Sequence, residues 1–321
     1  MRILGFVLIF VLRTDAFSNP SMEPLCQISE NAVNIKMDMA TRSADYYFLQ
    51  SLESDKIAID YAKVEHKNNA TYYGEAWHTA NHEWQLRRKE LKVPAGLLEE
   101  HVIAILCYTL DSPPLYSYFN RALRNYGATD KMYSECFHYK SLHYLLSVAL
   151  NVLQNSSWGP DPRTQVYRTI NRAVLVSEGA HIRFGQFAST SLNMFQSVST
   201  FTDKESRSNT LFNITTSLGV AIQNFSFFRR EEEVLIPPYE VFNVTNVIKW
   251  EDDLGVRGVN IVLSSIGRKQ TVVKLESDGP GHLRVVRMQE PISPLWFSLL
   301  ALVGLLLLAT CLFFLKKQKY I

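Results

Sequence analysis

The segment Asn155-Ser-Ser-Trp-Gly-Pro-Asp-Pro162 divides the sequence into two parts of different character. It combines a glycine, two prolines and small polar residues, which interrupt both helices and strands. Before it, apolar residues recur at helical spacing, as in residues 96–108, 115–126 and 141–153. These patterns predict a helical subdomain over residues 17–158.

After this divider the sequence carries short runs rich in β-branched and aromatic residues, which are typical of strands. They cover residues 165–167, 173–177, 181–191, 211–214, 232–236, 240–250, 260–263 and 270–275. A block of helices followed by a block of strands indicates an α+β fold. We therefore expect a mainly β catalytic core over residues 159–290. The two parts together hold about 275 residues, enough to bury a substantial core.

The N-terminus has the pattern of a secretory signal. Arg2 precedes the apolar run 3–12, and the small residues Thr14 and Ala16 suit a cleavage site. We assign residues 1–16 to a signal peptide.

The C-terminus has the pattern of a membrane anchor. Residues 295–315 contain no charge, and at helical rise they are long enough to cross the ~30 Å hydrocarbon core of a bilayer. The lysines in 316–321 predict a short cytosolic tail, with the catalytic part outside the plasma membrane. A lipid anchor is the alternative, with Ser277, Gly279 or Ser293 at its attachment site.

Other features agree with an extracellular or lumenal location. The sequence holds five N-x-S/T glycosylation sequons, at Asn69, Asn155, Asn213, Asn224 and Asn243. The net charge of +2 argues against a nucleic-acid partner, as does the absence of any run of basic residues with interleaved aromatic residues.

The cysteines allow at most one bridge in the extracellular part. Cys311 lies in the apolar tail, which leaves Cys26, Cys107 and Cys136 outside it. An odd number means that one thiol stays free or pairs elsewhere, and the spacing leaves open which one. No cluster has metal-ligand spacing, so we expect no metal.

Three ordered segments of the strand-rich part carry the chemistry: Val166-Tyr-Arg168, Phe184-Gly-Gln-Phe-Ala-Ser-Thr-Ser-Leu192 and Glu231-Glu-Glu-Val-Leu-Ile-Pro-Pro-Tyr-Glu240. They resemble the Arg, Ser-Thr-Ser and Glu-x-Glu motifs of the vertebrate arginine-specific mono-ADP-ribosyltransferases. The resemblance extends to Leu115-Tyr-Ser-Tyr-Phe-Asn-Arg-Ala-Leu123 and Phe137-His-Tyr-Lys-Ser-Leu-His143. It therefore covers nearly the whole mature chain.

The resemblance implies transfer of ADP-ribose from NAD⁺, or NADP⁺, to arginines of extracellular or lumenal proteins. Breaking the bond between ribose and nicotinamide passes through an oxocarbenium-like cation, which a nearby anion stabilises. Glu233 matches the family residue with that role. The resemblance assigns Glu231 to the acceptor, because a protonated guanidinium must be oriented and deprotonated before it attacks.

The other motif residues are expected to bind the co-substrate. Arg168 offers a fork of donors to the phosphates, and Ser189 is expected to hydrogen-bond the nicotinamide ribose. Tyr167, Thr190 and Ser191 complete the predicted NAD⁺ contacts, with the last two hydroxyls also expected to satisfy backbone groups. The sequence has no G-x-G-x-x-G or Walker loop, so we expect NAD⁺ in a cleft of the β core rather than on a Rossmann crevice.

The geometry of the acidic run is a further expectation. If the run is extended, alternation places Glu231 and Glu233 on one face and Glu232 on the other. Taken alone, such a run is usually a solvated loop. Just before it, Phe227 or Phe228 is expected either to contact the acceptor arginine or to pack in the core.

Two departures from the family pattern leave alternatives open. Thr169 stands where the family usually has a glycine whose backbone binds nicotinamide, and this weakens the expectation of tight binding. Cysteines common in the family are absent together from 163–165 and 216–218. The competing functions are a catalytically weak surface glycoprotein and an NAD⁺ glycohydrolase that uses water as acceptor.

Overall fold

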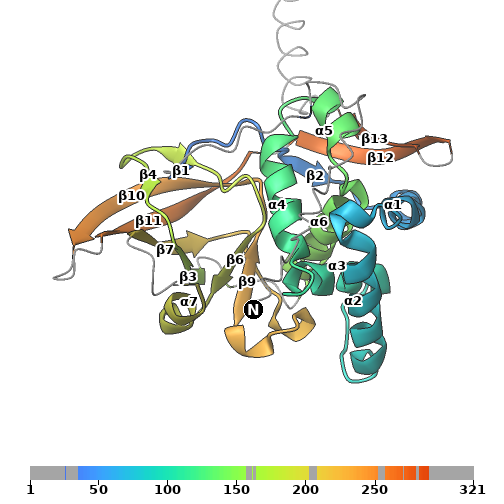
Figure 1. The fold of residues 1–321 in the computed structure, drawn as a ribbon, viewed down its shortest axis with the longest axis horizontal. Coiled ribbons are helices and arrows are strands. Elements are labelled where there is room, and N and C mark those ends of the chain that lie inside the picture. Colours follow the sequence, from blue (N-terminus) through green and yellow to red (C-terminus); the bar gives the residue numbers. More distant parts are fainter. Residues whose placement is uncertain are drawn as a thin grey trace, which may run out of the picture.

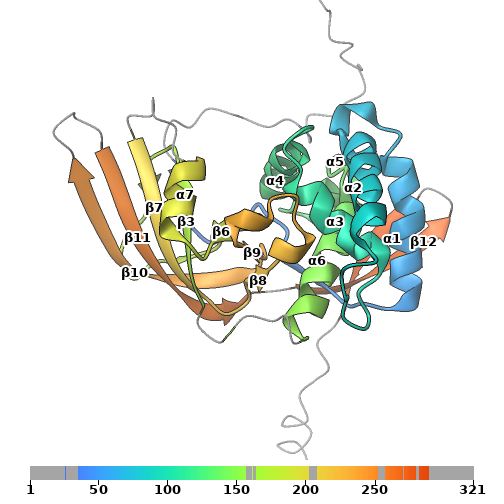
Figure 2. The ribbon, with the colours of Figure 1, turned by 90° about the horizontal axis from the view of Figure 1, so that it is seen from below.

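The computed structural model describes residues 26, 35–156, 161, 164–201, 208–251, 257–269, 271–279 and 282–288. Within them a layer of helices lies beside a layer of strands (Figures 1 and 2). The helical layer contains α1 (Leu52–Glu65), α2 (Tyr73–Arg87), α3 (Glu99–Thr109), α4 (Leu115–Asn125), α5 (Asp130–Cys136) and α6 (Lys140–Gln154). The α+β arrangement expected from the sequence is confirmed.

The helices begin and end where local chemistry requires. Ser51 caps α1 by accepting a hydrogen bond from the Ser54 amide at 3.0 Å, and Thr129 caps α5 through the Met132 amide at 3.1 Å. Helix α4 starts directly after Pro114. Helices α3 and α6 are buried on almost every face, which suits their largely apolar sequences and makes them the centre of the layer. Short one-turn helices connect other elements: η2 (Asn69–Thr71), η3 (Gln223–Phe225) and η4 (Arg229–Glu231).

The strand layer is one eight-stranded sheet in the order β5-β10-β11-β7-β3-β6-β9-β8. Its strands are β3 (Thr164–Ile170), β5 (His181–Ile182), β6 (Ala188–Ser191), β7 (Ser208–Thr216), β8 (Val220–Ala221), β9 (Glu233–Ile236), β10 (Glu240–Glu251) and β11 (Arg257–Arg268). Helix α7 (Met194–Phe201) follows β6 and packs against β3 and β6. The strands expected over residues 165–167, 211–214, 232–236, 240–250 and 260–263 are therefore present, several of them longer than expected.

Two smaller sheets join segments that lie far apart in the sequence. Strand β2 (Tyr46–Phe48) pairs in parallel with β12 (Thr271–Gly279), which also pairs with β13 (His282–Arg287). Strand β1 (Ile35–Lys36) pairs with β4 (Val174–Leu175). The sequence patterns predict neither β1 nor β2, because each is only two or three residues long.

The single strand expected over residues 181–191 is wrong. The structure places β5 and β6 at its two ends and an irregular segment between them. Gly185 in that segment has φ +64°, a conformation that side-chain-bearing residues rarely adopt, and an added Cβ would lie 2.5 Å from the Ala40 Cβ. Arg183 donates to the Met39 carbonyl at 3.0 Å and the Pro238 carbonyl at 2.9 Å. These contacts with other segments replace the continuous strand.

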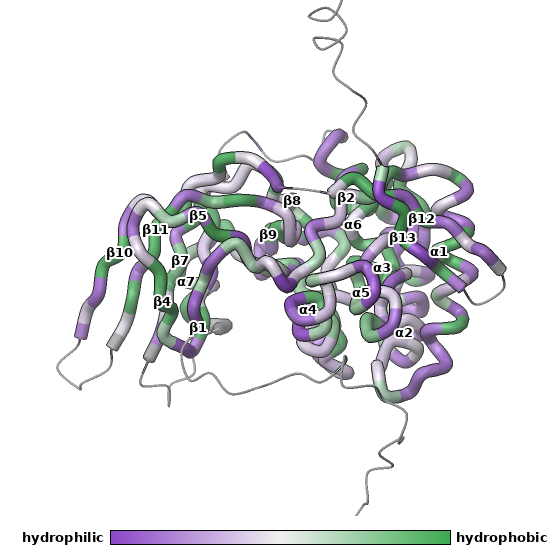
Figure 3. The backbone as a smooth tube through the Cα atoms, turned by 90° about the horizontal axis from the view of Figure 1, so that it is seen from above, coloured by the Kyte–Doolittle hydropathy of each residue, from purple (hydrophilic) through white to green (hydrophobic). Residues whose placement is uncertain are grey.

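Two hydrophobic cores meet at β9. Val234 and Ile236 lie in a core within the strand layer, whereas Leu235 lies in the core that contains the helices. Because side chains alternate along a strand, Glu233 points to the same side as Leu235, toward the helices. Val273 and Leu275 of β12 also belong to the helical core, so β12 packs with helices that precede it by more than a hundred residues. Figure 3 shows green, hydrophobic stretches along β10 and β11 and purple turns on α4.

Cys26 and Cys136 form a disulfide, and Cys107 is a free, buried thiol. This resolves the pairing that the sequence left open. At residues 216–218 the buried Glu240 carboxylate accepts hydrogen bonds from the Thr216 hydroxyl and the Ser217 amide, both at 2.7 Å. Hydrogen bonds thus fasten the turn where a cysteine is common in the family.

The sequons occupy different environments. Asn69 and Asn155 are exposed, as expected for glycosylated positions. Asn213, Asn224 and Asn243 are half-buried, and the Asn213 side chain accepts a hydrogen bond from Gln165 at 2.8 Å. Glycosylation stays a prediction at all five.

The expected signal peptide, the apolar segment 295–315 and the tail 316–321 lie outside the described residues. Within the part of the chain that is described, no helix is both long and apolar enough to cross a bilayer.

Candidate functional site

The site lies where β3 and β6 separate. These strands pair only at Tyr167 and Ser191, whereas β3 pairs with β7 along its whole length. Arg168 reaches across the separation, and its Nη1 donates to the Ser189 carbonyl at 2.6 Å. Burial lowers the pKa of Arg168, while the charge of Glu233 is among the influences that raise it. The strand geometry therefore holds a half-buried cation beside Ser189.

Glu233 is the carboxylate at the centre of the site. It begins β9, pairs in register with Ser191 on β6, and is only 6% exposed. Its Oε2 accepts a hydrogen bond from the Ser226 hydroxyl at 3.4 Å. Burial raises the pKa of Glu233 to about 7, and the charge of Glu231 raises it further, whereas Ser189, Ser226 and Arg168 oppose the rise. A buried carboxylate of this kind interacts strongly with a positive charge that develops next to it.

Glu231 lies near Glu233, but the extended geometry expected for the acidic run is wrong. Glu231 ends the one-turn helix η4, and Glu232 is left-handed with φ +48° and ψ +44°. The backbone bends because the Ser191 hydroxyl binds the Glu231 carbonyl at 2.8 Å and the Leu192 amide binds that of Glu232 at 3.3 Å. The bend, and not strand alternation, brings the two carboxylates together. Glu232 is exposed, as expected.

The hydroxyls of the Ser-Thr-Ser segment have two kinds of partner: Thr190 and Ser191 bind backbone carbonyls, whereas Ser189 lies near Glu233. The Thr190 hydroxyl donates to the Val234 carbonyl at 2.6 Å, and Ser191 makes the bond to Glu231 given above. Both side chains are buried, so they fasten β6 to the segment that carries the glutamates. Ser189 is half-buried, and its hydroxyl is among the groups that lower the pKa of Glu233. Tyr167, also half-buried, lies opposite Ser191 on β3.

The helical layer supplies residues that the motifs alone did not identify. The Tyr108 hydroxyl from α3 donates to the Phe187 carbonyl at 2.9 Å, and Asn120 Nδ2 from α4 donates to Tyr108 Oη at 3.0 Å. The Ser189 hydroxyl is also near enough to Tyr108 to lower the pKa of the phenol, although burial raises that pKa overall. These contacts hold β6 against the helices. Asn120 lies within the 115–123 segment that resembles the family, which is the signal that could have identified it.

Arg124 brings a second cation to the site from α4. Its Nη1 donates to Gln186 Oε1. Burial lowers the pKa of Arg124, and the charge of Arg168 lowers it further. Arg124 is exposed and Arg168 is half-buried, so both guanidiniums can reach a ligand. Two guanidiniums close enough to affect each other are well suited to bind a diphosphate.

The aromatic residues before Glu231 take different positions. Phe227 packs against the helical core, whereas Phe228 is 37% exposed. Of the two, Phe228 is accessible to an acceptor.

The pKa of Glu231 is raised by its surroundings. Burial raises it most, and the charge of Asp111, which follows α3, raises it further. The surroundings of Glu231 are therefore acidic and suited to a cation.

Thr169 points away from the residues above. It is 4% exposed, and its hydroxyl lies 3.2 Å from that of Ser197 on α7. Its neighbour Arg168 extends toward Ser189 and Glu233. The side chain that replaces the expected glycine therefore fills space beneath α7.

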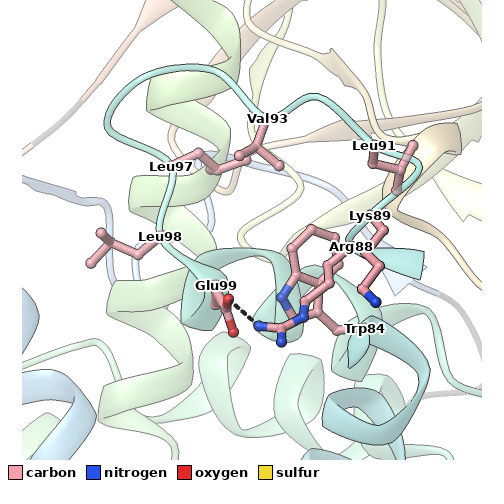
Figure 4. Close-up of a pocket in the computed structure, with 8 residues that line it drawn as sticks. All are labelled: Trp84, Arg88, Lys89, Leu91, Val93, Leu97, Leu98 and Glu99. Atoms are coloured by element: carbon pink, nitrogen blue, oxygen red, sulfur yellow. Dashed lines mark hydrogen bonds and ion pairs between the residues drawn. The ribbon is translucent and has the colours of Figure 1, made fainter. Parts of the chain in front are cut away.

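A separate hollow of about 370 Å³ lies between the end of α2 and the start of α3 (Figure 4). Arg88 Nη1 contacts Glu99 Oε1 there at 3.0 Å, beside the buried ring of Trp84. None of the predicted site residues lines it. Within the described residues, no cluster of His, Cys, Asp and Glu has the arrangement of a metal site.

The chain is similar to known proteins over most of its length. Residues 37–271 match the family model described as NAD:arginine ADP-ribosyltransferase. The chain is 36% identical over 242 residues to NAD(P)(+)–arginine ADP-ribosyltransferase 1 of Gallus gallus, covering 75% of this chain and 72% of that protein. It is 33% identical over 289 residues to the GPI-linked NAD(P)(+)–arginine ADP-ribosyltransferase 1 of Homo sapiens, covering 84% of each.

The fold is similar to a crystal structure of the mono-ADP-ribosyltransferase ART2.2. The TM-score is 0.61 at 30% identity, with 74% of this chain and 96% of that chain covered. A variant of ART2.2 has also been crystallised with NAD, and it gives a TM-score of 0.60.

Proposed function

We propose that this chain, which belongs to the NAD:arginine ADP-ribosyltransferase family, transfers ADP-ribose from NAD⁺ to protein arginines and releases nicotinamide. One observation carries the proposal. The buried Glu233 carboxylate lies near Ser189 and Arg168, and a second carboxylate, Glu231, is close enough to raise its pKa. This arrangement provides one anion for the ribosyl cation and another for the acceptor.

The donor half of the reaction breaks the bond between ribose C1′ and the nicotinamide nitrogen. The bond's electron pair leaves with nicotinamide, and the positive charge that develops on the ribose is stabilised by Glu233. Ser189 holds the Glu233 carboxylate in place and offers a hydroxyl to the ribose. Arg168 and Arg124 bind the diphosphate through guanidinium donors. Tyr167 completes this side of the site.

The acceptor half forms a bond between C1′ and a guanidinium nitrogen. Glu231 orients the guanidinium and accepts its proton as the new bond forms. Burial and the charge of Asp111 raise the pKa of Glu231, which makes its carboxylate a stronger proton acceptor. Phe228 offers an exposed ring on which the planar guanidinium can stack, and Asp111 adds attraction for a cation.

The competing functions are separated by a single assay. The ectodomain is incubated with NAD⁺ labelled in its adenosine half, with agmatine or with buffer alone. Arginine transfer predicts labelled agmatine. A glycohydrolase gives free ADP-ribose in both samples and no labelled agmatine, and a catalytically weak glycoprotein leaves NAD⁺ intact. Either of these results would overturn the proposed function. The intact set of Arg168, Ser189, Glu231 and Glu233 favours transfer.

We further propose that the catalytic part acts at the outer face of the plasma membrane, where extracellular or lumenal proteins supply the arginines. The names of the relatives, ecto-enzyme and GPI-linked enzyme, support a surface location. The lysines in 316–321 favour a transmembrane anchor over a lipid. Phosphatidylinositol-specific phospholipase should then release no activity from intact cells. Release of active enzyme would establish a lipid anchor instead.

A further inference from the structure

A loop between the helical layer and the glutamates is fastened by one arginine. We define residues 226–231 as the acceptor loop. Arg87, the last residue of α2, donates from Nη1 to the Ser226 carbonyl at 2.7 Å. Its guanidinium carbon also lies 5.7 Å from the centre of the Phe227 ring. Arg87 thus contacts the backbone and a side chain at the start of the loop.

The position of the Arg87 guanidinium is itself restricted. Its Nε pairs with Glu83 one turn earlier on α2, and the Arg87 side chain is only 18% exposed. The Phe227 amide adds a second fastening by donating to the Thr109 hydroxyl on α3 at 3.2 Å. A charge-assisted hydrogen bond from a restricted guanidinium is the stronger of these two contacts.

The same loop connects the two glutamates. The Ser226 hydroxyl accepts from the Phe228 amide at 3.0 Å and donates to Glu233 Oε2 at 3.4 Å. The Glu231 amide donates to the Phe228 carbonyl at 3.1 Å. If Ser226 moves, Phe228 should move with it, and Glu231 should move in turn because it is hydrogen-bonded to Phe228. The Ser226 contact with Glu233 is long, and the backbone of Glu233 is also held by the pairing of β9 with β6, so Glu233 should move less than Glu231.

We infer that Arg87 is a positioning residue that sets how ADP-ribose is divided between arginine acceptors and water. This inference rests on the proposed function. None of the contacts of Arg87 given above involves the predicted NAD⁺-binding residues, Glu231 or Glu233. Its effect on the reaction would therefore come only through the acceptor loop. With Arg87 in place, Glu231 and Phe228 are held ready to orient a guanidinium. Without it, the ribosyl cation still forms at Glu233 but meets water more often.

The test compares Arg87→Met and Arg87→Lys with a matched control, Arg88→Met. Arg88 directly follows Arg87 at the end of α2, but it pairs with Glu99 in the hollow between α2 and α3 (Figure 4). Both of these side chains are nearly half-exposed. Methionine keeps the helix and the apolar length of either side chain. We expect Arg87→Met to lower kcat/KM for agmatine about tenfold or more, since small misplacements near a reacting centre are costly.

The other kinetic constants should separate positioning from a general loss of structure. The KM for NAD⁺ and the rate of NAD⁺ hydrolysis without agmatine should stay within about threefold of wild type, because Glu233, Ser189 and Arg168 are unchanged. Arg87→Lys should recover part of the transfer, since an ammonium can still donate to Ser226. Arg88→Met should behave as wild type. Equal loss of transfer and hydrolysis, or no loss of either, would overturn the inference.

A second measurement does not depend on activity. Hydrogen exchange of a peptide covering residues 226–231 should be faster in Arg87→Met than in wild type or Arg88→Met, because the loop has lost its main fastening. Unchanged exchange would overturn the inference even if the wild type proved to be only a hydrolase. A wild type without transfer but with faster loop exchange in Arg87→Met would instead reject the proposed function alone.

Discussion

Glu233 and Glu231 are two residues apart in the sequence but belong to regions held in different ways. Glu233 stands on β9, which is paired with β6 on one side and β8 on the other, and its carboxylate is buried. Glu231 ends a single helical turn and is held by isolated hydrogen bonds. The difference suggests a division of work. In the proposed mechanism, cleavage of NAD⁺, which is common to every acceptor, would take place at the strands, and the arginine acceptor, which varies, would meet a loop.

The largest effect is expected from Glu233→Gln. The amide keeps the shape but removes the charge opposite the ribosyl cation, so transfer and NAD⁺ hydrolysis should both fall about 10²-fold or more. Initial rates with and without agmatine measure this. The variant should melt no lower than wild type at pH 8, since a neutral amide avoids the cost of a buried charge. Near-normal activity would show that the strand carboxylate is not the essential anion.

Glu231→Gln tests the other side of the comparison. Transfer to agmatine should fall at least about tenfold because the guanidinium loses its proton acceptor, while hydrolysis stays within about threefold. Labelled agmatine and released nicotinamide are measured in the same reaction. If both activities fall together, Glu231 takes part in donor chemistry and the division of work is wrong. If neither falls, the motif has been misassigned.

The rate of NAD⁺ hydrolysis should depend on pH in a way that distinguishes Glu233 from Glu231. The pKa of Glu233 is raised to about 7, and catalysis needs its ionised form. Hydrolysis at low NAD⁺ concentration should therefore decrease as pH falls below 7, approaching about tenfold per pH unit. Removing the negative charge of Glu231 lowers the pKa of Glu233, so in Glu231→Gln the midpoint should move to lower pH. A profile that stays flat from pH 5 to 8 would contradict this role.

The smallest effect is expected from Thr169→Gly. The Thr169 side chain packs beneath α7, away from Arg168, so the KM for NAD⁺ should change less than about threefold. Stability should fall by roughly 1 kcal/mol, because a buried side chain is lost and a glycine is added to a strand. Thermal melting and a titration with NAD⁺ measure the two quantities. A much lower KM in the variant would mean that Thr169 impairs co-substrate binding.

The sequence predicts the regular parts of the fold because their patterns are local. Helices α3, α4 and α6 lie where apolar residues recur at helical spacing, and their ends agree within a few residues. The pairing of β2 with β12 joins Tyr46 to Thr271, and no local pattern can indicate a contact at that separation. The break at Gly185 likewise depends on a neighbour, Ala40, from a distant segment.

The match of residues 37–271 confirms the family that the motifs indicated. The assignment of Arg168, Ser189 and both glutamates to the site stays a prediction, and the motifs did not predict the geometry in which the structure holds them. The left-handed Glu232 could not be foreseen, because glutamate has no preference for that conformation and tertiary hydrogen bonds impose it. Arg87 was equally hidden, since an arginine at the end of a helix is usually solvated.

The first and last described segments of the chain are both linked to α5, and this has a mechanical consequence. Cys26 is linked to Cys136 at the end of α5, and Arg287 of β13 forms an ion pair at 2.8 Å with Asp130 at its start. A pulling force applied through residue 288 would act first on that ion pair and on the β12–β13 hairpin, which pack against the helical layer. The strands that carry Glu233 are not in the direct line of that load. Tension from an attachment beyond β13 would thus strain the hairpin while leaving the reaction centre undeformed.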